Sequence, residues 1–249
     1  MGSLDDAIAS IPRRIGRVKA VYAQYSPLFE KFRGGLPIAF FATIAQWESD
    51  GRMDAPGSAA LGEVGVFQIS EHTEEEYSTR AGIRTTLSGN FWLAGLDYNA
   101  EARRLQLKYP HLFVNNNADL WMTARLVFAI GRGGTSKVLD TSKPTPGNVF
   151  NQLVAWAKKS GGIPLGSQSA AKVAYRIQAI PVQWEIAQKC GLPSSPGIPS
   201  LVMPPDVSIP FRLPKDLTGK LPLVDQGGVL VPVLLAAVAV IGYFLWKKG

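Results

Sequence analysis

The sequence predicts a mainly α-helical domain with one small β-hairpin, followed by a proline-rich linker and a C-terminal transmembrane helix. Three observations predict this class. Apolar residues recur at intervals of three and four residues through most of residues 1–190. Residues 191–226 contain eight prolines and little periodicity, and residues 227–246 carry no charge. We therefore expect a globular domain over residues 1–190, a linker over 191–226 and a membrane anchor over 227–249.

Helices account for most of the predicted domain. Residues 1–34 are expected to be helical, because apolar side chains keep a helical period up to a glycine pair that ends it. The segment after Pro37 is apolar nearly all round, which is typical of a buried central helix. Residues 63–70 (EVGVFQIS) alternate like a short strand and predict the hairpin. Further amphipathic helices are expected over residues 90–110, 117–131, 149–162 and 170–191, the last interrupted by Pro181.

Composition restricts the partners and cofactors. A net charge of +7, with 18% of residues charged, indicates a packed domain with a mild preference for polyanions such as a bacterial envelope. No basic stripe is present, so no nucleic acid partner is expected. Cys190 is the single cysteine, which excludes an intrachain disulfide, and His72 and His111 are too few histidines to indicate a zinc site. We expect neither a metal nor a cofactor.

The uncharged C-terminal segment predicts the membrane anchor. As a helix, residues 227–246 would extend about 30 Å, the thickness of the hydrocarbon core of a bilayer. Tyr243 and Trp246 fall at the end of this segment and Lys247–Lys248 follow, as at a membrane interface with a positive flank. The N-terminal residues have no basic region or apolar run, so we expect no secretory signal. The proline-rich linker could reach on the order of 100 Å from the bilayer.

Glu48 has the chemistry and the position that general acid catalysis requires. It ends the apolar helix, where burial and the negative end of the helix dipole both disfavour a charged carboxylate. A carboxylic acid kept protonated in this way can donate a proton to a substrate. Gly65 allows a tight turn that approaches a ligand closely, and Gln68 offers an amide that can bind hydroxyl and acetamido groups. Flat faces for sugar rings could come from the tryptophans, including Trp47, Trp92 and Trp121.

The motifs around these residues resemble the soluble lytic transglycosylase domain of the lysozyme-like superfamily. Ile44–Ser49 (IAQWES) is similar to the family's Gln-x-Glu-Ser motif, and Ser58–Ile69 (SAALGEVGVFQI) to its Ser-x-x-Gly-Ala-x-Gly-Leu-Met-Gln-Ile motif. Residues 90–98 (NFWLAGLDY) resemble its Asn-x-x-x-Gly segment, with one extra residue between Asn90 and Gly95. The motifs cover about 55 residues, and the helical texture is compatible over about 190. The resemblance implies a lysozyme-like α+β fold.

The resemblance also implies a peptidoglycan-cleaving enzyme with Glu48 as its catalytic residue. Glu48 would protonate the glycosidic oxygen between N-acetylmuramic acid and N-acetylglucosamine. It would then take the proton of the muramyl 6-hydroxyl as a 1,6-anhydro ring closes, without water or a covalent enzyme intermediate. By their positions in the motif, Ser49, Gly65, Phe67 and Gln68 would shape the site and contact the substrate.

Two departures from the family pattern leave alternatives open. The family's Ala-Tyr-Asn-Ala-Gly turn corresponds here to Val127–Gly131, so Phe128 would contact substrate without a hydroxyl group. Tyr98 or Tyr77 could supply that hydroxyl from elsewhere in the chain. Glu63 stands where the family commonly has alanine. It is either a solvated charge or a second carboxylate that positions water for inverting hydrolysis.

The sequence is therefore expected to encode a membrane-anchored peptidoglycan lytic transglycosylase. Its partners would be glycan strands of peptidoglycan and, through Gly227–Trp246, a lipid bilayer. A bacteriophage virion would explain an anchor without an export signal: the particle would bring the enzyme to the cell wall during entry, beside other virion proteins. A bacterial inner-membrane enzyme that faces the periplasm is the alternative location. Two other functions stay open, a lysozyme-type muramidase and a non-catalytic virion or membrane protein that keeps the fold.

Overall fold

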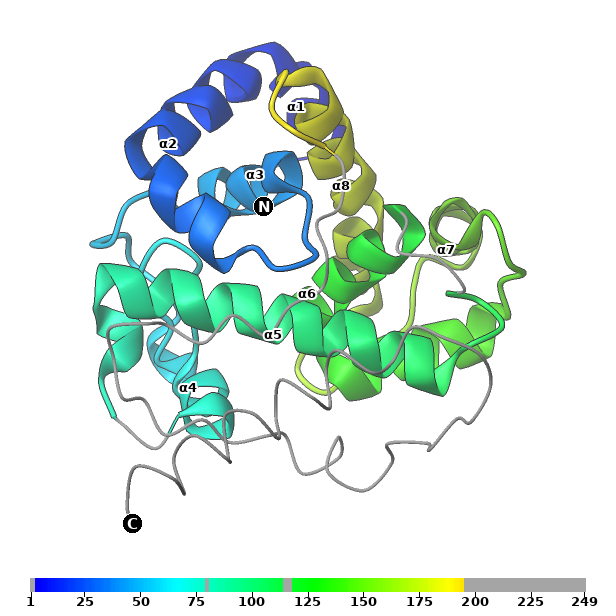
Figure 1. Cartoon of the computed structure of the whole chain (residues 1–249). Coiled ribbons are helices and arrows are strands. Elements are labelled where there is room, and N and C mark those ends of the chain that lie inside the picture. Colours follow the sequence, from blue (N-terminus) through cyan, green and yellow to red (C-terminus); the bar gives the residue numbers. More distant parts are fainter. Residues whose placement is uncertain (1–2, 79–80, 114–117, 195–249) are drawn as a thin grey trace, which may run out of the picture. The chain divides into compact units, whose positions relative to one another are not determined.

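The computed structural model describes residues 3–78, 81–113 and 118–194. Helices hold 71% of these residues, which confirms the mainly helical prediction. Figure 1 shows α5 crossing the helical assembly, with α2, α3 and α8 above it and α4 below it in this view. In chain order the elements are α1 (Leu4–Ala9), α2 (Ile11–Phe32), α3 (Ile38–Ser49), η1 (Ala59–Leu61), α4 (Glu71–Tyr77), η2 (Ile83–Thr85), α5 (Leu87–Lys108), α6 (Ala118–Ser142), α7 (Val149–Ser160) and α8 (Ala170–Lys189).

Helix α3 is the buried centre of the fold, as its apolar sequence predicted. Ten of its twelve residues are buried, and it packs against both α2 and α8. Four phenylalanine rings connect α3 to the rest of the core, with centroids 4.5–6.4 Å apart. They are Phe29 of α2, Phe41 of α3, Phe67 of the turn before α4 and Phe91 of α5. This aromatic core joins α3 to α2, to α5 and to the turn before α4.

Helix α6 bends at Gly131, whereas α8 continues through its proline. Gly131 has φ 77° and ψ 162°, a conformation that glycine adopts readily, so the regular helix is interrupted there. Just before the bend, the carbonyl oxygen of Ala129 accepts a hydrogen bond from Arg176 of α8. The predicted interruption of α8 at Pro181 is wrong. Packing of this helix against α3, α6 and α7 outweighs the missing backbone donor.

The predicted hairpin is reduced to a turn closed by one antiparallel bridge. Val64 and Ile69 exchange both backbone hydrogen bonds, at 3.1 and 3.0 Å. Between them, Gly65 and Gln68 have left-handed φ values of 82° and 53°, which exclude a continuous extended backbone. The prediction of a strand over residues 63–70 is therefore wrong. Within the described residues, β-structure is limited to isolated bridges.

The predicted linker and membrane span fall almost entirely outside the part of the chain that the structure describes. Helix α8 ends at Lys189, next to the expected domain boundary at residue 190. The description stops at residue 194, so the segments 195–226 and 227–246 have no structural counterpart here. Among the described helices, none combines the length and the apolarity of a transmembrane span.

Candidate functional site

The Glu-Ser end of helix α3 is fixed against the turn that precedes α4. Ser49 Oγ donates to the carbonyl oxygen of Val66 at 2.8 Å and so joins the helix end to residues 64–69, called the 64–69 turn below. Asp50 ends α3 in a left-handed conformation with φ 55°. Because Ser49 is buried and bonded in this way, it positions the turn. The substrate contact expected for it from the sequence is not available in this structure.

Asn90 holds the other side of the 64–69 turn. Its side chain is fully buried at the start of α5. The Asn90 Oδ1 atom accepts from the Phe67 N–H at 2.9 Å, and Nδ2 donates to the Val64 carbonyl at 2.9 Å. A Cβ atom on Gly65 would lie 2.4 Å from Asn90 Nδ2, so no other residue fits there without displacing Asn90. Gly65 therefore acts through its backbone, and its role is to let Asn90 close the turn.

A second glycine lets α5 approach the end of α2. A Cβ atom on Gly95 would lie 1.9 Å from the carbonyl oxygen of Phe32, the last residue of α2. Real Cβ atoms do not approach backbone oxygen so closely, and a carbonyl cannot move aside as a flexible side chain can. The Asn90 and Gly95 pair noted in the sequence thus secures two contacts of the same helix, one to the 64–69 turn and one to α2.

Glu48 forms an ion pair with Arg125 of α6. The Arg125 side chain is only 6% exposed, whereas that of Glu48 is 22% exposed. The guanidinium also donates to Gln183 Oε1 of α8 at 3.0 Å and to the Tyr98 hydroxyl of α5 at 3.3 Å. Four helices meet in this group, called the Glu48–Arg125 cluster. The expectation of an isolated acid in an apolar setting is wrong, because a buried guanidinium faces Glu48 directly.

Burial and charge act on the pKa of Arg125 in opposite directions. Burial alone lowers this pKa, but the neighbouring Glu48 and Tyr98 raise it by more, so the guanidinium stays charged. Burial raises the pKa of the Tyr98 hydroxyl, which keeps it neutral. The Tyr98 ring stacks on Phe128 with centroids 5.3 Å apart and planes 9° from parallel, and the Arg125 guanidinium lies 5.6 Å from the Phe128 centroid. Phe128 is thus the outer layer of this cluster.

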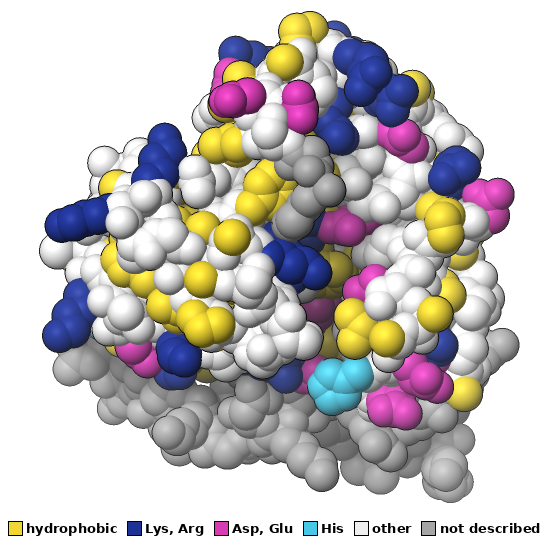
Figure 2. All heavy atoms as spheres, turned by 180° about the vertical axis from the view of Figure 1, so that it is seen from behind, with side chains coloured by type: hydrophobic (Ala, Val, Ile, Leu, Met, Phe, Trp, Pro, Cys, Tyr) yellow, Lys and Arg dark blue, Asp and Glu magenta, His cyan; other side chains and the backbone are white. Residues whose placement is uncertain are grey.

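A cleft of about 720 Å³ opens beside Phe128. Its walls are the segment from Ala59 to Glu63, most of α4, and facing residues of α5 and α6. Figure 2 shows a groove on the face opposite to that in Figure 1, with acidic side chains inside it. Glu48 is not among the residues that line the cleft in the described part of the chain. Glu48 is connected to the cleft through Arg125, whose guanidinium lies over the ring of Phe128.

Two more of the predicted site residues line this cleft. Gln68 is pinned by its own amide, because Nε2 donates to the Gly65 carbonyl at 2.8 Å and to the Ala55 carbonyl at 3.4 Å. Glu63 accepts from the Ser58 N–H at 3.1 Å, which keeps its carboxylate at the wall. The structure thus brings Glu63, Gln68 and Phe128 to one cleft, as the sequence predicted for a substrate site.

Other aromatic residues expected at the substrate lie in the core. Phe67 is completely buried among the phenylalanines described above, so its predicted substrate contact is wrong. Trp92 and Trp121 are 2% and 1% exposed and present no face to a sugar. Trp47 is partly exposed, but the Arg14 guanidinium covers its ring at 4.1 Å from the centroid. Among the aromatic residues named here, Phe128 is the one that lines the cleft.

Sequence reasoning missed two charged residues, Arg125 and Asp97. Both stand alone within apolar runs, LWMTARLVFAIG and NFWLAGLDY, and both are buried in the structure. A single charge on an apolar helix face needs a partner, so each was a signal for a buried polar contact. Asp97 lines the cleft, and the hydroxyl of Tyr77 donates to it at 3.0 Å.

Comparisons with known proteins add no relative to this picture. No protein-family model matches the chain, and a search of curated proteins finds no significant match. Within the described ranges, no group of three or more histidine, cysteine, aspartate or glutamate side chains is placed to hold a metal ion.

Proposed function

We propose that this protein is a membrane-anchored peptidoglycan lytic transglycosylase with a lysozyme-like fold, and that it cleaves the bond between N-acetylmuramic acid and N-acetylglucosamine. The observation that carries the proposal is the position of Glu48. It stands near the end of a buried helix whose last residue, Ser49, is bonded to the 64–69 turn, and its partner Arg125 lies beside Phe128, which lines the cleft together with Gln68. Chance similarity of short motifs would give no reason for these segments to converge.

The proposed reaction uses one carboxyl group twice. Glu48 gives its proton to the glycosidic oxygen as the bond from that oxygen to the muramyl C1 breaks. The muramyl 6-hydroxyl oxygen then bonds to C1, and its proton passes to the Glu48 carboxylate. The products are a 1,6-anhydromuramyl end and a free hydroxyl on the leaving sugar, and the enzyme returns to its starting protonation state.

Arg125 shapes this cycle. Its guanidinium stabilises the carboxylate that exists between the two proton transfers, when negative charge on Glu48 is greatest. The first transfer needs a proton on Glu48, so a bound glycan has to loosen the ion pair. Phe128 covers Arg125 on the cleft side, and a sugar ring packed on Phe128 is in the right place to do so.

Glu63 supports a second candidate reaction, hydrolysis by a lysozyme-type muramidase. Its carboxylate is held at the cleft wall by the Ser58 N–H, where it could act as general base on a water molecule. The same cleft would then yield reducing muramyl ends in place of anhydro ends.

The Glu48–Arg125 ion pair itself supports a third candidate, a non-catalytic virion or membrane protein. A carboxylate bound to a guanidinium that also bridges α5 and α8 has the form of a structural connection between helices. In that case the fold would remain and the chemistry would be absent.

The proposed location follows from the sequence outside the described residues. The proline-rich linker would hold the catalytic domain away from a bilayer spanned by residues 227–246. A phage virion that opens the cell wall during entry is the proposed setting for a wall-cleaving domain carried on such an anchor. The partners would be peptidoglycan glycan strands, the lipid bilayer and neighbouring virion proteins.

Digestion of purified peptidoglycan by the full-length protein tests the proposal. Mass spectrometry of the products should show anhydromuramyl ends, and Glu48→Gln should slow their release by about 100-fold or more, the usual contribution of a general acid. Circular dichroism checks that the variant is folded, and Glu185→Gln on α8 is the control for a lost surface carboxylate.

The products and the variants separate the three candidates. Reducing ends, with a rate that falls in Glu63→Gln, would replace the transglycosylase by the muramidase. Cleavage that survives Glu48→Gln would show that Glu48 is not the catalytic acid. Absence of any cleavage by the unmodified protein would favour the structural candidate.

A further inference from the structure

The cleft is strongly acidic although the protein is basic. Six carboxyl groups but one guanidinium belong to its lining residues, while the whole chain has a net charge of +7. A negative cleft on a positive protein attracts a cationic group and repels an anionic one. The charged lining residues are Glu63, Glu71, Glu75, Glu76, Asp97, Glu101 and Arg132.

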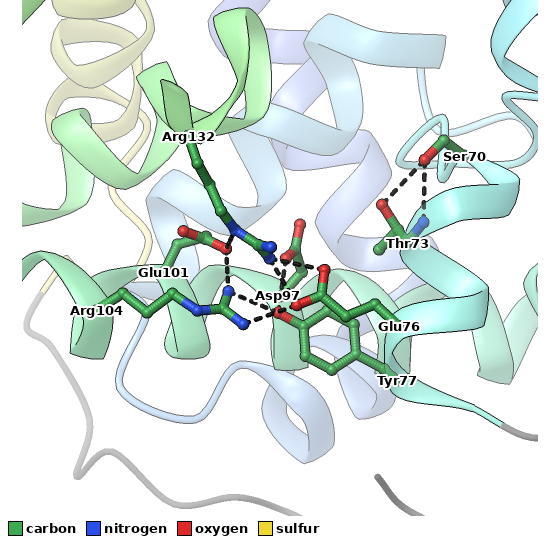
Figure 3. A network of polar contacts seen from close by, with 8 residues as sticks. All are labelled: Ser70, Thr73, Glu76, Tyr77, Asp97, Glu101, Arg104 and Arg132. Carbon is green, nitrogen blue, oxygen red and sulfur yellow. Dashed lines mark hydrogen bonds and ion pairs between the residues drawn. The ribbon is translucent and has the colours of Figure 1, made fainter. Parts of the chain in front are cut away.

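Part of this charge is organised in a network of polar contacts (Figure 3), four of whose residues line the cleft; it is called the cleft-floor cluster below. Arg104 donates to Glu76 at 2.7 Å and forms an ion pair with Glu101. Arg132 bridges the same two carboxylates, at 2.7 Å to Glu76 and 2.6 Å to Glu101. Two arginines thus balance two glutamates. The members of the cluster are Glu76, Tyr77, Asp97, Glu101, Arg104 and Arg132.

Asp97 is the third carboxyl group of the cluster, and the two arginines form ion pairs with the other two. It is 8% exposed and lines the cleft. Its Oδ1 atom accepts from the Tyr77 hydroxyl at 3.0 Å, and within the described residues its Oδ2 atom has neither a hydrogen bond nor an ion pair. Burial, and then the neighbouring Glu101, raise the pKa of Asp97 to about 7. A buried carboxylate with an open acceptor on a cleft is stabilised when a cation takes the place of its proton.

We infer that the cleft floor is a subsite for a primary ammonium group of the substrate, with Asp97 Oδ2 as its acceptor. This inference rests on the proposed function, because the substrate is taken to be a peptidoglycan fragment. An ammonium group is compact and donates several hydrogen bonds, which suits a single open oxygen at the bottom of a cleft. The amine could come from a glucosamine without its N-acetyl group or from the free side-chain amine of a diamino acid in the stem peptide.

Binding to the full-length protein, measured by calorimetry, tests the subsite in two arms. The first compares a glucosamine tetrasaccharide with the N-acetylglucosamine tetrasaccharide. The second compares a muramyl peptide that has a free diamino acid amine with the same peptide acetylated on that amine. In one arm the free amine should bind about tenfold more tightly, the effect of one well-placed charge-assisted hydrogen bond. The arm that responds identifies the source of the amine.

Three variants make the test specific to Asp97. Asp97→Asn keeps the acceptor for Tyr77 but loses the charge, so the tenfold preference for the free amine should disappear. Arg132→Gln removes a positive charge from the cleft floor and should strengthen amine binding, which tests the subsite even if Asp97→Asn does not fold. Glu185→Gln changes the net charge equally but lies on α8, outside the cleft lining, and should leave the preference unchanged.

Two outcomes would overturn the inference. One is equal binding of the free and acetylated forms in both arms, and the other is a preference that survives Asp97→Asn. Failure of the proposed function gives a different result, because cleavage would then be absent while the amine preference persists. Glu48→Gln should likewise lose cleavage and keep the preference.

Discussion

The Glu48–Arg125 cluster and the cleft-floor cluster are both built from neighbouring helices but differ in their charge balance. The Glu48–Arg125 cluster pairs one acid with one arginine, and the guanidinium bonds Gln183, Tyr98 and Glu48. The cleft-floor cluster has three acids and two arginines, and one acid keeps an open acceptor. A balanced group connects helices, whereas an unbalanced group on a cleft has the capacity to bind. The difference explains why we place substrate recognition in the second group.

Displacing helix α5 should disturb both clusters at once and gives the largest expected effect. Gly95→Ala places a Cβ atom 1.9 Å from the Phe32 carbonyl and should lower the free energy of unfolding by about 4 kcal/mol. Helix propensity alone predicts the opposite sign, because alanine favours helices over glycine by about 1 kcal/mol. Gly133→Ala on α6, where a Cβ atom would meet nothing within 4 Å, is the matched control and should stabilise slightly. Denaturant unfolding of both variants measures the contrast, and similar values would contradict it.

Asp97→Asn should change how the stability of the protein depends on pH. The folded-state pKa of Asp97, about 7, lies above the ordinary value of 3.8. The folded protein therefore binds more protons than the unfolded chain between these values, and Asp97 lowers stability as the pH rises from 4 to 7. Relative to the unmodified protein, the variant should gain on the order of 3 kcal/mol across this window. Unfolding at pH 4 and pH 8 checks it, and a constant difference would contradict the raised pKa.

Glu48→Gln should destabilise the balanced cluster at neutral pH. It leaves the buried guanidinium of Arg125 without a countercharge. The cost should be about 2 kcal/mol, below the roughly 3–5 kcal/mol of a fully buried pair, because Glu48 is 22% exposed. Adding Arg125→Met should restore most of the loss, and denaturant unfolding of both variants measures it. If the double variant were less stable than the single one, Arg125 would contribute mainly through Gln183 and Tyr98.

Arg132→Gln should have the smallest effect on stability and a clear effect on titration. Its side chain is 43% exposed, so its loss should cost about 1 kcal/mol and less at high salt. Arg132 lowers the pKa of Asp97, so the variant should shift the Asp97 titration to higher pH. Carboxyl-carbon NMR follows that titration directly. An unchanged midpoint would mean that Arg132 and Asp97 do not interact.

The helices could be predicted from the sequence because periodicity is a local property. The apolar run after Pro37 gave α3 with its buried faces, and the later amphipathic segments gave α5 to α8. Two local patterns predicted the wrong secondary structure. The alternation in residues 63–70 reflects a turn with left-handed residues, and Pro181 did not break a helix that is packed on five others. The short helix α4 was missed, since a sequence as acidic as EHTEEEY has no apolar stripe.

The site could be predicted only in part because its contacts join residues far apart in the chain. Glu63, Gln68 and Phe128, which were chosen through motif positions, all line one cleft in the structure, and their contact with substrate stays a prediction. The partner of Glu48 lies 77 residues away, and no motif marks it. The role of an aromatic residue such as Phe67 depends on which face of the turn packs against the core. An alternating sequence pattern alone does not predict which face that is.

Helix α8 is the last part of the described domain to leave the ribosome, and it completes the site. Gln183 accepts a hydrogen bond from Arg125, and Trp184 packs on Phe40 of α3 with ring centroids 4.8 Å apart. Until that helix docks, the guanidinium beside Glu48 lacks one of its acceptors and α3 lacks a covering surface. A nascent chain therefore lacks the complete Glu48–Arg125 cluster until its last described helix has been made, and the four helices that meet there should lock together in one late step of folding.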